Sequence, residues 1–440
     1  SRPLRSPEKR MLKLRLLGGL LLWVTTLYCA PKLRTGNGRG GEGGGQYPEW
    51  SALRIQEGKT PALVREVARQ VALLPSYEIA RGELDRRGLS LDIKEVHTIA
   101  TYAGEAALTY RRRLLEHYRT GQMAVSEALA GKRVGVFVDG GRTKLRTVTR
   151  RQKGRGKAKT QTRRYQSHWR EPKLLIIYEF DDTGRMVPGS QSVIDGTFAG
   201  PDELMEVLAM HLHRLGAASA EVVSLGADGA PWVWDRWDWV IGRVGLDASR
   251  VVKTLDWCHA SHHISLALSH LLPNEDDRRR TYKRLRGQLK RGHWAQVVLA
   301  LLDLAESLPD THAVWTELAY LEQHGLADHL NYGTYRRRGL PLGSGAIESA
   351  IRRVINLRMK GNSISWKEPN AEAMLVLRGL VLTRRWDDEF AAISTSMATD
   401  RKREWRFQSP DMPAQLKAGD KICPPTPQVP DNSASYSTAA

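Results

Sequence analysis

Residues 339–360 read GLPLGSGAIESAIRRVINLRMK, a loop of small residues followed by a basic, amphipathic stretch. Ser344 is a favoured helix N-cap residue and the neighbouring glycines are poor helix formers, so the spacing predicts a helix from about Ala346, with Glu348 in its first turn. The cationic side chains of this helix are spaced to share one face, and the opposite, apolar face would pack on a core. The cationic residues are Arg352, Arg353, Arg358 and Lys360. Glu348 is therefore either a carboxylate that works beside phosphates or an ordinary first-turn acid that complements the helix dipole.

The composition of the chain indicates a polyanionic partner. The 440 residues include 67 Lys and Arg against 48 Asp and Glu, a formal net charge of +19, and the pI is about 9.9. A charge of this size favours nucleic acid as the partner. The three cysteines, Cys29, Cys258 and Cys423, are far apart. The spacing supports neither a disulfide framework nor a zinc ribbon, and it fits a reducing cytoplasm. We therefore expect a cytoplasmic, nucleoid-associated protein.

Residues 10–30 allow two interpretations. A basic start followed by LLGGLLLWVTTLYCA resembles an export signal, and in that case the protein is membrane-anchored. The apolar run is short for a membrane span, and its β-branched and aromatic residues suit a strand or hairpin equally well. We expect no membrane association.

The next segment is predicted to be helical. Glycine-dense residues 34–47 suggest a linker that sets off residues 1–47 as an appendage. Residues 48–130 carry helical periodicity, with two helices joined by a Gly-containing turn and Lys94 on the second. This is the pattern of a helix-turn-helix DNA-binding domain, and equally of a plain helical hairpin.

A strand and a basic tract follow. Residues 132–141, KRVGVFVDGG, predict a buried strand that ends at Asp139. Between residues 142 and 170 there are 12 Lys or Arg and no Asp or Glu, which suits a surface that follows a phosphate backbone and offers Tyr165 and Trp169 for stacking. The alternative is a solvated hairpin or a disordered insertion. The candidate DNA-binding residues are Lys94, Arg142, Lys144, Arg151, Lys153, Arg155, Arg163, Arg164, Arg352 and Arg353.

Two further strands are predicted to end at Asp228 and Asp256, each followed by a helix. The βββαβαβα order predicts an α/β fold, a mixed sheet flanked by helices with acids converging on one edge. The expected divisions are 131–272 for the first part of this core, 273–335 for an all-α insertion, 336–400 for the second part, and 401–440 for a disordered tail.

Asp139, Asp228 and Glu348 each lie at the end of a predicted element. Carboxylates gathered at one edge repel one another, and a divalent metal resolves the repulsion. Oxygen ligands favour Mg²⁺ or Mn²⁺, and two such ions about 4 Å apart support in-line phosphoryl transfer. The alternative for either aspartate is ordinary Asp-Gly turn sequence.

DGG at Asp139, GADGAPWVW around Asp228, LDWCHASHH and LPLGSGAIESAIRRVINLRMKG together resemble the bacterial insertion-sequence DDE transposases, Kra-type branch, which are akin to the Mutator-like group. The resemblance covers about residues 132–386. It implies an RNase H-like core interrupted by an α-helical insertion, a metal-binding triad of Asp139, Asp228 and Glu348, and a supporting motif formed by Asp256 and His259.

The expected function is binding of double-stranded DNA at transposon terminal inverted repeats, followed by metal-dependent strand cleavage and transfer into target DNA. The resemblance also implies a homodimer or larger assembly on DNA. The alternative is a catalytically inactive, transposase-derived DNA-binding protein, which binds DNA with the same salt sensitivity and cuts no strand.

Overall fold

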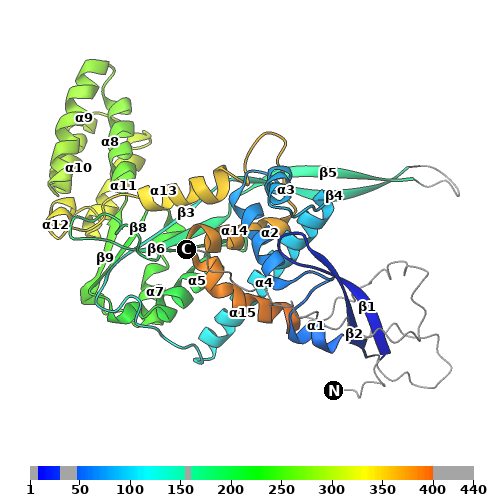
Figure 1. Ribbon diagram of the computed structural model, residues 1–440. Coiled ribbons are helices and arrows are strands. Elements are labelled where there is room, and N and C mark those ends of the chain that lie inside the picture. Colours follow the sequence, from blue (N-terminus) through cyan, green and yellow to red (C-terminus); the bar gives the residue numbers. More distant parts are fainter. Residues whose placement is uncertain (1–7, 30–46, 154–159, 400–440) are drawn as a thin grey trace, which may run out of the picture.

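A five-stranded mixed sheet forms the centre of the protein (Figure 1). The computed structural model describes residues 8–29, 47–153 and 160–399. The strand order is β7-β6-β3-β8-β9, in which β3, β8 and β9 are parallel and β6 and β7 are antiparallel to their neighbours. The strands are β3 (Arg133–Gly140), β6 (Lys173–Glu179), β7 (Val193–Thr197), β8 (Val222–Ala227) and β9 (Val251–Leu255). Near-continuous apolar runs form these strands because both faces of the sheet are covered by helices.

The alternation of side chains along β3 divides the core into two layers. Val134, Val136 and Val138 pack in the cluster that includes helices α5 (Pro201–Arg214) and α7 (Trp237–Val244). Phe137 lies on the opposite face, in the larger cluster that includes α13 (Gly345–Ile351) and α14 (Glu368–Leu382). The fold is therefore α/β, with a mixed sheet between helical layers.

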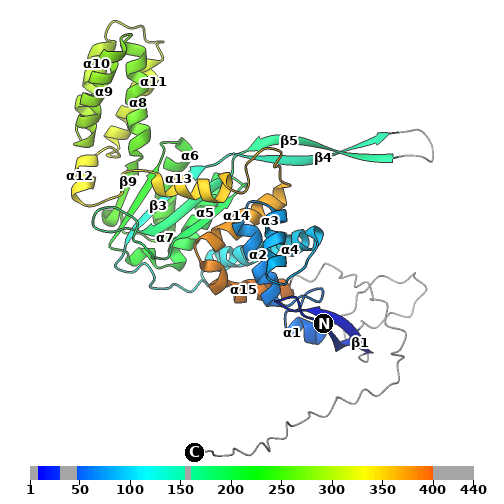
Figure 2. The ribbon, with the colours of Figure 1, turned by 45° about the horizontal axis from the view of Figure 1, so that its top comes forward.

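A helical bundle projects from one end of the sheet (Figure 2). It lies between β9 and α13 in the chain. Residues 273–335, expected as an insertion, form four of its helices, and α8, which was expected in the first part of the core, packs with them. The short helix α6 (Pro231–Trp234) lies at its foot. The bundle helices are α8 (Trp257–Leu271), α9 (Glu275–Lys290), α10 (Trp294–Ala305), α11 (Val314–Leu326) and α12 (Tyr332–Arg337).

The N-terminal helices pack on the last two helices of the chain. The elements here are β1 (Glu8–Arg15), β2 (Leu21–Tyr28), α1 (Pro48–Ala52), α2 (Pro61–Leu73), α3 (Tyr77–Arg86), α4 (Ile93–Arg119) and α15 (Arg385–Thr399). Helices α2 and α4 share one core cluster with α14 and α15, so the division at residue 130 separates segments of sequence and not separate cores. Arg111 of α4 reinforces this contact by pairing with Asp195 of β7 at 2.9 Å and with Glu372 of α14 at 2.6 Å.

A long two-stranded hairpin projects from the end of the molecule that lies opposite the helical bundle (Figures 1 and 2). It is formed by β4 (Thr143–Lys153) and β5 (Thr160–Arg170), which pair with Thr143 opposite Arg170. Its root is anchored where Trp366 exchanges backbone hydrogen bonds with Lys144 and Arg146, at 3.0 and 2.8 Å, and Leu145 is buried. The basic tract of residues 142–170 is thus a hairpin over its described residues.

The helix predicted after Ser344 differs from the expectation. It ends at Ile351 and continues as one π-helical turn, Arg352–Asn356. The prediction that Arg358 lies on an exposed cationic face is wrong: Arg358 is buried, donates a hydrogen bond to the carbonyl of Val71 at 3.2 Å, and stacks on Tyr77 and Trp366. The π turn shifts the helical register, which carries Arg358 toward α2.

Residues 10–30 form a hairpin over their described part, because β1 and β2 pair antiparallel from Glu8 opposite Tyr28 to Arg15 opposite Leu21. Within residues 8–29, 47–153 and 160–399, no helix combines the length and the apolar character needed to cross a membrane. The predicted tail at 401–440 and most of the predicted linker at 34–47 lie outside the described residues.

Candidate active site at the carboxyl edge of the sheet

Three aspartates lie side by side where the three parallel strands end. Phe137 pairs with Gly226, and Ala227 pairs with Leu255. Continuing these registers aligns Asp139 with Asp228 and Asp228 with Asp256. Neighbouring strands are about 4.8 Å apart, so the three residues form a row across the carboxyl edge of the sheet.

Asp139 is half-buried in this row, and its charge is poorly compensated. Burial raises its pKa to about 6, and the neighbouring charge of Asp228 adds to the effect. The backbone N–H of Gly140, which donates to Oδ1 at 2.5 Å, and the nearby His259 act in the opposite direction. A carboxyl group with this pKa would gain from a nearby cation, because a cation stabilises its charged form.

Asp228 is held by two hydrogen bonds. Its Oδ1 accepts from the backbone N–H of Ala230 at 3.1 Å, which fixes the turn after β8. Its carbonyl oxygen accepts from the hydroxyl of Tyr320 on α11 at 2.9 Å. The inserted bundle thus contacts the backbone of a candidate ligand directly.

Asp256 is fully buried, and its carboxylate accepts three hydrogen bonds. Oδ2 accepts from the backbone N–H of His259 at 3.0 Å and from Nδ1 of the same residue at 2.7 Å, while Oδ1 accepts from the backbone N–H of Ser344 at 2.7 Å. Burial raises the pKa of Asp256, but the bonds from His259 and Ser344 outweigh it, so the pKa is lowered. Asp256 therefore organises the site, because its carboxylate links the start of α8 to the backbone of Ser344.

His259 supplies positive charge at this edge. Its hydrogen bond to Asp256 raises its pKa against the opposing effect of burial, and the charges of Asp228 and Asp139 raise it further. The imidazole is thus stabilised in its protonated form beside two candidate metal ligands.

Glu348 is attached to the same edge through Ser344. Helix α13 packs against β3 and β6, and the exposed Glu348 accepts a hydrogen bond through Oε1 from the hydroxyl of Ser344 at 2.6 Å. Burial is the main cause of the raised pKa of the Cys258 thiol, and the charges of Asp256 and Glu348 raise it further. Glu348 therefore lies near the Asp256 end of the row.

The predicted triad is brought together only in part. In the described portions of the chain, no group of three His, Cys, Asp or Glu side chains has an arrangement that could hold a metal ion. Asp139 and Asp228 are adjacent hard-oxygen donors, which fits Mg²⁺ or Mn²⁺. Glu348 is bonded to Ser344 and does not complete the set in this conformation.

The predicted DNA-binding residues that the structure describes lie on α4, on the β4–β5 hairpin with the residue before it, and in the π-helical turn after α13. Lys94 is exposed in the first turn of α4. One turn later, partial burial and the charges of Lys367 and Arg146 lower the pKa of His97. Because Arg146 is on β4, the start of α4 lies near the hairpin. Arg142, Lys144 and Arg352 are exposed, and Arg353 is partly buried. Arg151, Lys153, Arg163 and Arg164 are on the hairpin strands, but their side chains and the whole of Arg155 lie outside the described residues.

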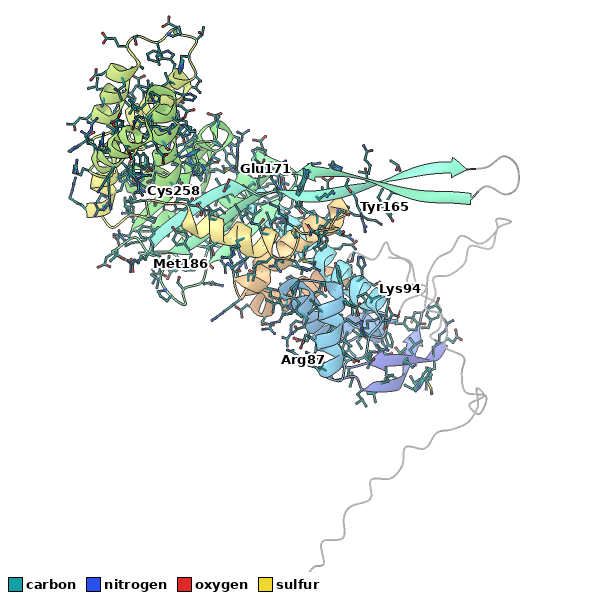
Figure 3. The ribbon with its side chains drawn as sticks, turned by 90° about the horizontal axis from the view of Figure 1, so that it is seen from above. Arg87, Lys94, Tyr165, Glu171, Met186 and Cys258 are labelled. Atoms are coloured by element: carbon teal, nitrogen blue, oxygen red, sulfur yellow. The ribbon has the colours of Figure 1, made fainter. Side chains whose placement is uncertain are left out.

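Sequence reasoning missed Glu171, which precedes β6. Its carboxylate lies against Gly140, its charge raises the pKa of Asp139, and it pairs with Lys173. Figure 3 shows Glu171 where the hairpin joins the sheet and Cys258 at the foot of the bundle. The signal that could have found Glu171 is topological, because an antiparallel β6 must begin where β3 ends.

Comparisons of this chain with models of protein families, with curated proteins and with solved structures found no match.

Proposed function

We propose that this chain is a DDE transposase with an RNase H-like core, which cuts DNA at transposon ends and joins it to a target. The observation that carries the proposal is the register of Asp139 and Asp228 at the ends of adjacent parallel strands, with the Glu348 helix tied to that edge by Asp256 and Ser344. The mixed strand order and a helical bundle inserted between β9 and α13 support the RNase H-like assignment.

Asp139 and Asp228 would hold the metal ions, and Glu348 would join them after its side chain leaves Ser344. Bound Mg²⁺ or Mn²⁺ supplies activation of a water or 3′-hydroxyl and neutralises charge on the phosphate. The chain's own contribution is preorganisation: Asp256 accepts a hydrogen bond from Nδ1 of His259 and so favours the protonated ring, which would stabilise negative charge on a phosphodiester bound at this edge.

The surroundings of the site suit DNA. The cationic hairpin and the first turn of α4 lie at one end of the molecule (Figure 3), and Lys and Arg side chains there would neutralise backbone phosphates. A homodimer or larger assembly on DNA remains part of the proposal, because two transposon ends must be brought together.

The test is cleavage of labelled duplexes that carry the inverted repeats flanking the gene. With the full chain and Mg²⁺, we expect nicking at the repeat end that Glu348→Gln, Asp139→Asn and Asp228→Asn each reduce by about 10³-fold or more, because several kcal/mol of transition-state stabilisation is lost. EDTA should abolish cleavage while binding persists.

Glu322→Gln is the matched control, because Glu322 is an exposed glutamate on the surface of α11. It should cleave like the wild type. Cleavage by Glu348→Gln at the wild-type rate would exclude Glu348 as a ligand.

One observation favours a second candidate function. Because Glu348 is bonded to Ser344 and no three-ligand group is assembled among the described residues, the chain could be a catalytically inactive DNA-binding protein of transposase descent. That function predicts repeat binding without any metal-dependent cutting by the wild type.

A further inference from the structure

One face of the β4–β5 hairpin is both aromatic and cationic. Partners in an antiparallel pair lie on the same face, and successive pairs alternate between faces. The pairs Lys144–Trp169, Arg146–Ser167 and Val148–Tyr165 therefore share one face, here called the aromatic face. The intervening pair Leu145–His168 is on the other face, where Leu145 is buried at the root of the hairpin.

The aromatic face exposes large apolar side chains to solvent. Trp169 is 51% exposed, Tyr165 49% and Val148 42%. Exposed apolar side chains scattered singly need no explanation, but three on one face of a projecting ribbon mark an interaction site. Figure 3 shows Tyr165 on the part of the hairpin that extends away from the body of the protein.

Cations accompany these rings. The guanidinium of Arg146 is 4.8 Å from the centroid of Tyr165, and that of Arg142 is 5.6 Å from the centroid of Trp169. Among the residues that the structure describes, Arg142, Lys144 and Arg146 form no ion pair, whereas Arg170 at the root of the hairpin pairs with Glu368 at 3.6 Å. Nε of Arg146 is buried without a hydrogen-bond partner. The face thus offers aromatic planes and uncompensated positive charge together.

This combination selects one partner chemistry. A second copy of this chain or another protein would have to match a tract that contains 12 Lys or Arg and no acid. A duplex presents phosphates and base edges but hides the faces of its bases. A strand with unpaired bases offers phosphates for the cations and base faces for the rings, which is how non-specific single-strand binding works.

The aromatic face begins beside the candidate active site. Trp169 is two residues before Glu171, whose carboxylate lies against Gly140, next to Asp139. Arg142 is three residues after Asp139, so at most about 10 Å of chain separates them. A strand freed at the carboxyl edge would reach these rings without crossing the rest of the protein.

We propose that the aromatic face binds single-stranded DNA, taking the unpaired bases of a strand opened next to the candidate active site. The inference rests on the proposed function for the source of that strand. The binding itself requires no catalysis and can be measured with metal removed.

The experiment measures fluorescence anisotropy of three labelled DNAs of the same sequence with the full chain in EDTA: a single strand, a forked duplex with one unpaired arm, and a blunt duplex. Tyr165→Ala and Trp169→Ala should each weaken binding to the single strand and the fork by about 10-fold, as loss of a stacked base does. Binding to the blunt duplex should change less than about 2-fold, since its phosphate contacts persist.

Two controls isolate stacking. Tyr165→Phe and Trp169→Phe keep a ring and should restore most of the affinity. Trp239→Ala removes a ring of similar exposure, 47%, from α7, and should leave all three affinities unchanged.

Equal losses on all three DNAs would overturn the inference in favour of general phosphate binding, and unchanged affinities would overturn it outright. Loss of self-association in Trp169→Ala, seen by sedimentation without DNA, would assign the face to a second copy instead. None of these measurements uses cleavage. A negative binding result would therefore not affect the Glu348→Gln cleavage test, and a wild type that does not cleave DNA would not affect the inference about single-strand binding.

Discussion

Replacing Asp256 by asparagine should destabilise the protein more than any exposed Asp-to-Asn change. The carboxylate accepts three hydrogen bonds, from the backbone N–H of Ser344 and from the backbone N–H and Nδ1 of His259, and it is fully buried. The asparagine amide has one oxygen and one NH₂ group. The best arrangement directs the oxygen at His259 and the NH₂ group at Ser344, which places two donors against each other.

The magnitude follows from these contacts. Loss of the bond to Ser344, a hydrogen bond to a charged group, costs about 1.5–3 kcal/mol, and the two bonds to His259 weaken because the acceptor is no longer charged. We expect a decrease of about 3 kcal/mol in the free energy of unfolding. Urea denaturation followed by circular dichroism measures it.

Asp247→Asn is the matched control. Asp247 is also an N-cap, accepting from the backbone N–H of Ser249 at 2.9 Å, but it is exposed. Asparagine caps helices about as well as aspartate, so this change should cost less than about 0.5 kcal/mol. Equal effects of Asp256→Asn and Asp247→Asn would refute the central role given to Asp256.

The hydrogen-bonded pair of Asp256 and His259 predicts that the free energy of unfolding depends on pH. The lowered pKa of Asp256 means that its contribution to stability is present above its unfolded pKa and is lost as the pH falls through its folded pKa. The raised pKa of His259 means that its contribution is present below its unfolded pKa and is lost as the pH rises through its folded pKa. The stability gap between wild type and Asp256→Asn should therefore be widest between these limits, and ¹⁵N-histidine NMR should show the His259 pKa falling in the variant.

Arg111→Leu should cost about 3–5 kcal/mol in urea denaturation, because it leaves the buried carboxylate of Asp195 without its 2.9 Å partner. Although burial raises it, the charge of Arg111 and other contacts hold the pKa of Asp195 well below its ordinary value, so this penalty should narrow as the pH falls below about 4. Gly226→Ala should cost about 1–3 kcal/mol, since its Cβ would overlap the buried ring of Phe137. Gly242→Ala meets nothing within 4 Å on a helix and should stabilise by about 0.5–1 kcal/mol. A stabilising Gly226→Ala or a destabilising Gly242→Ala would refute the packing argument.

The elements of the core were predictable because their signals are local. The run KRVGVFVDGG is apolar over one strand length and ends in an acid, so strand β3 and the position of Asp139 at its end follow from a few neighbouring residues. The helical texture of residues 273–335 likewise predicted the helices found there.

The arrangement of the site required the tertiary structure. That Asp256 aligns with Asp228, that Glu171 meets Asp139, and that Arg358 is buried against Tyr77 all depend on contacts between segments far apart in the chain. Strand register and a single π turn decide these contacts, and neither leaves a periodic signal in the sequence.

For the stretch at residues 339–360, the sequence by itself determined that a helix begins after Ser344 and carries Glu348 in its first turn. Only the tertiary structure decided what that glutamate contacts. Asp256 holds the backbone of Ser344, and the hydroxyl of Ser344 holds Glu348. The physical reason is that helix formation depends on residues within one turn, whereas the direction of an exposed carboxylate depends on whichever donor the fold brings within reach.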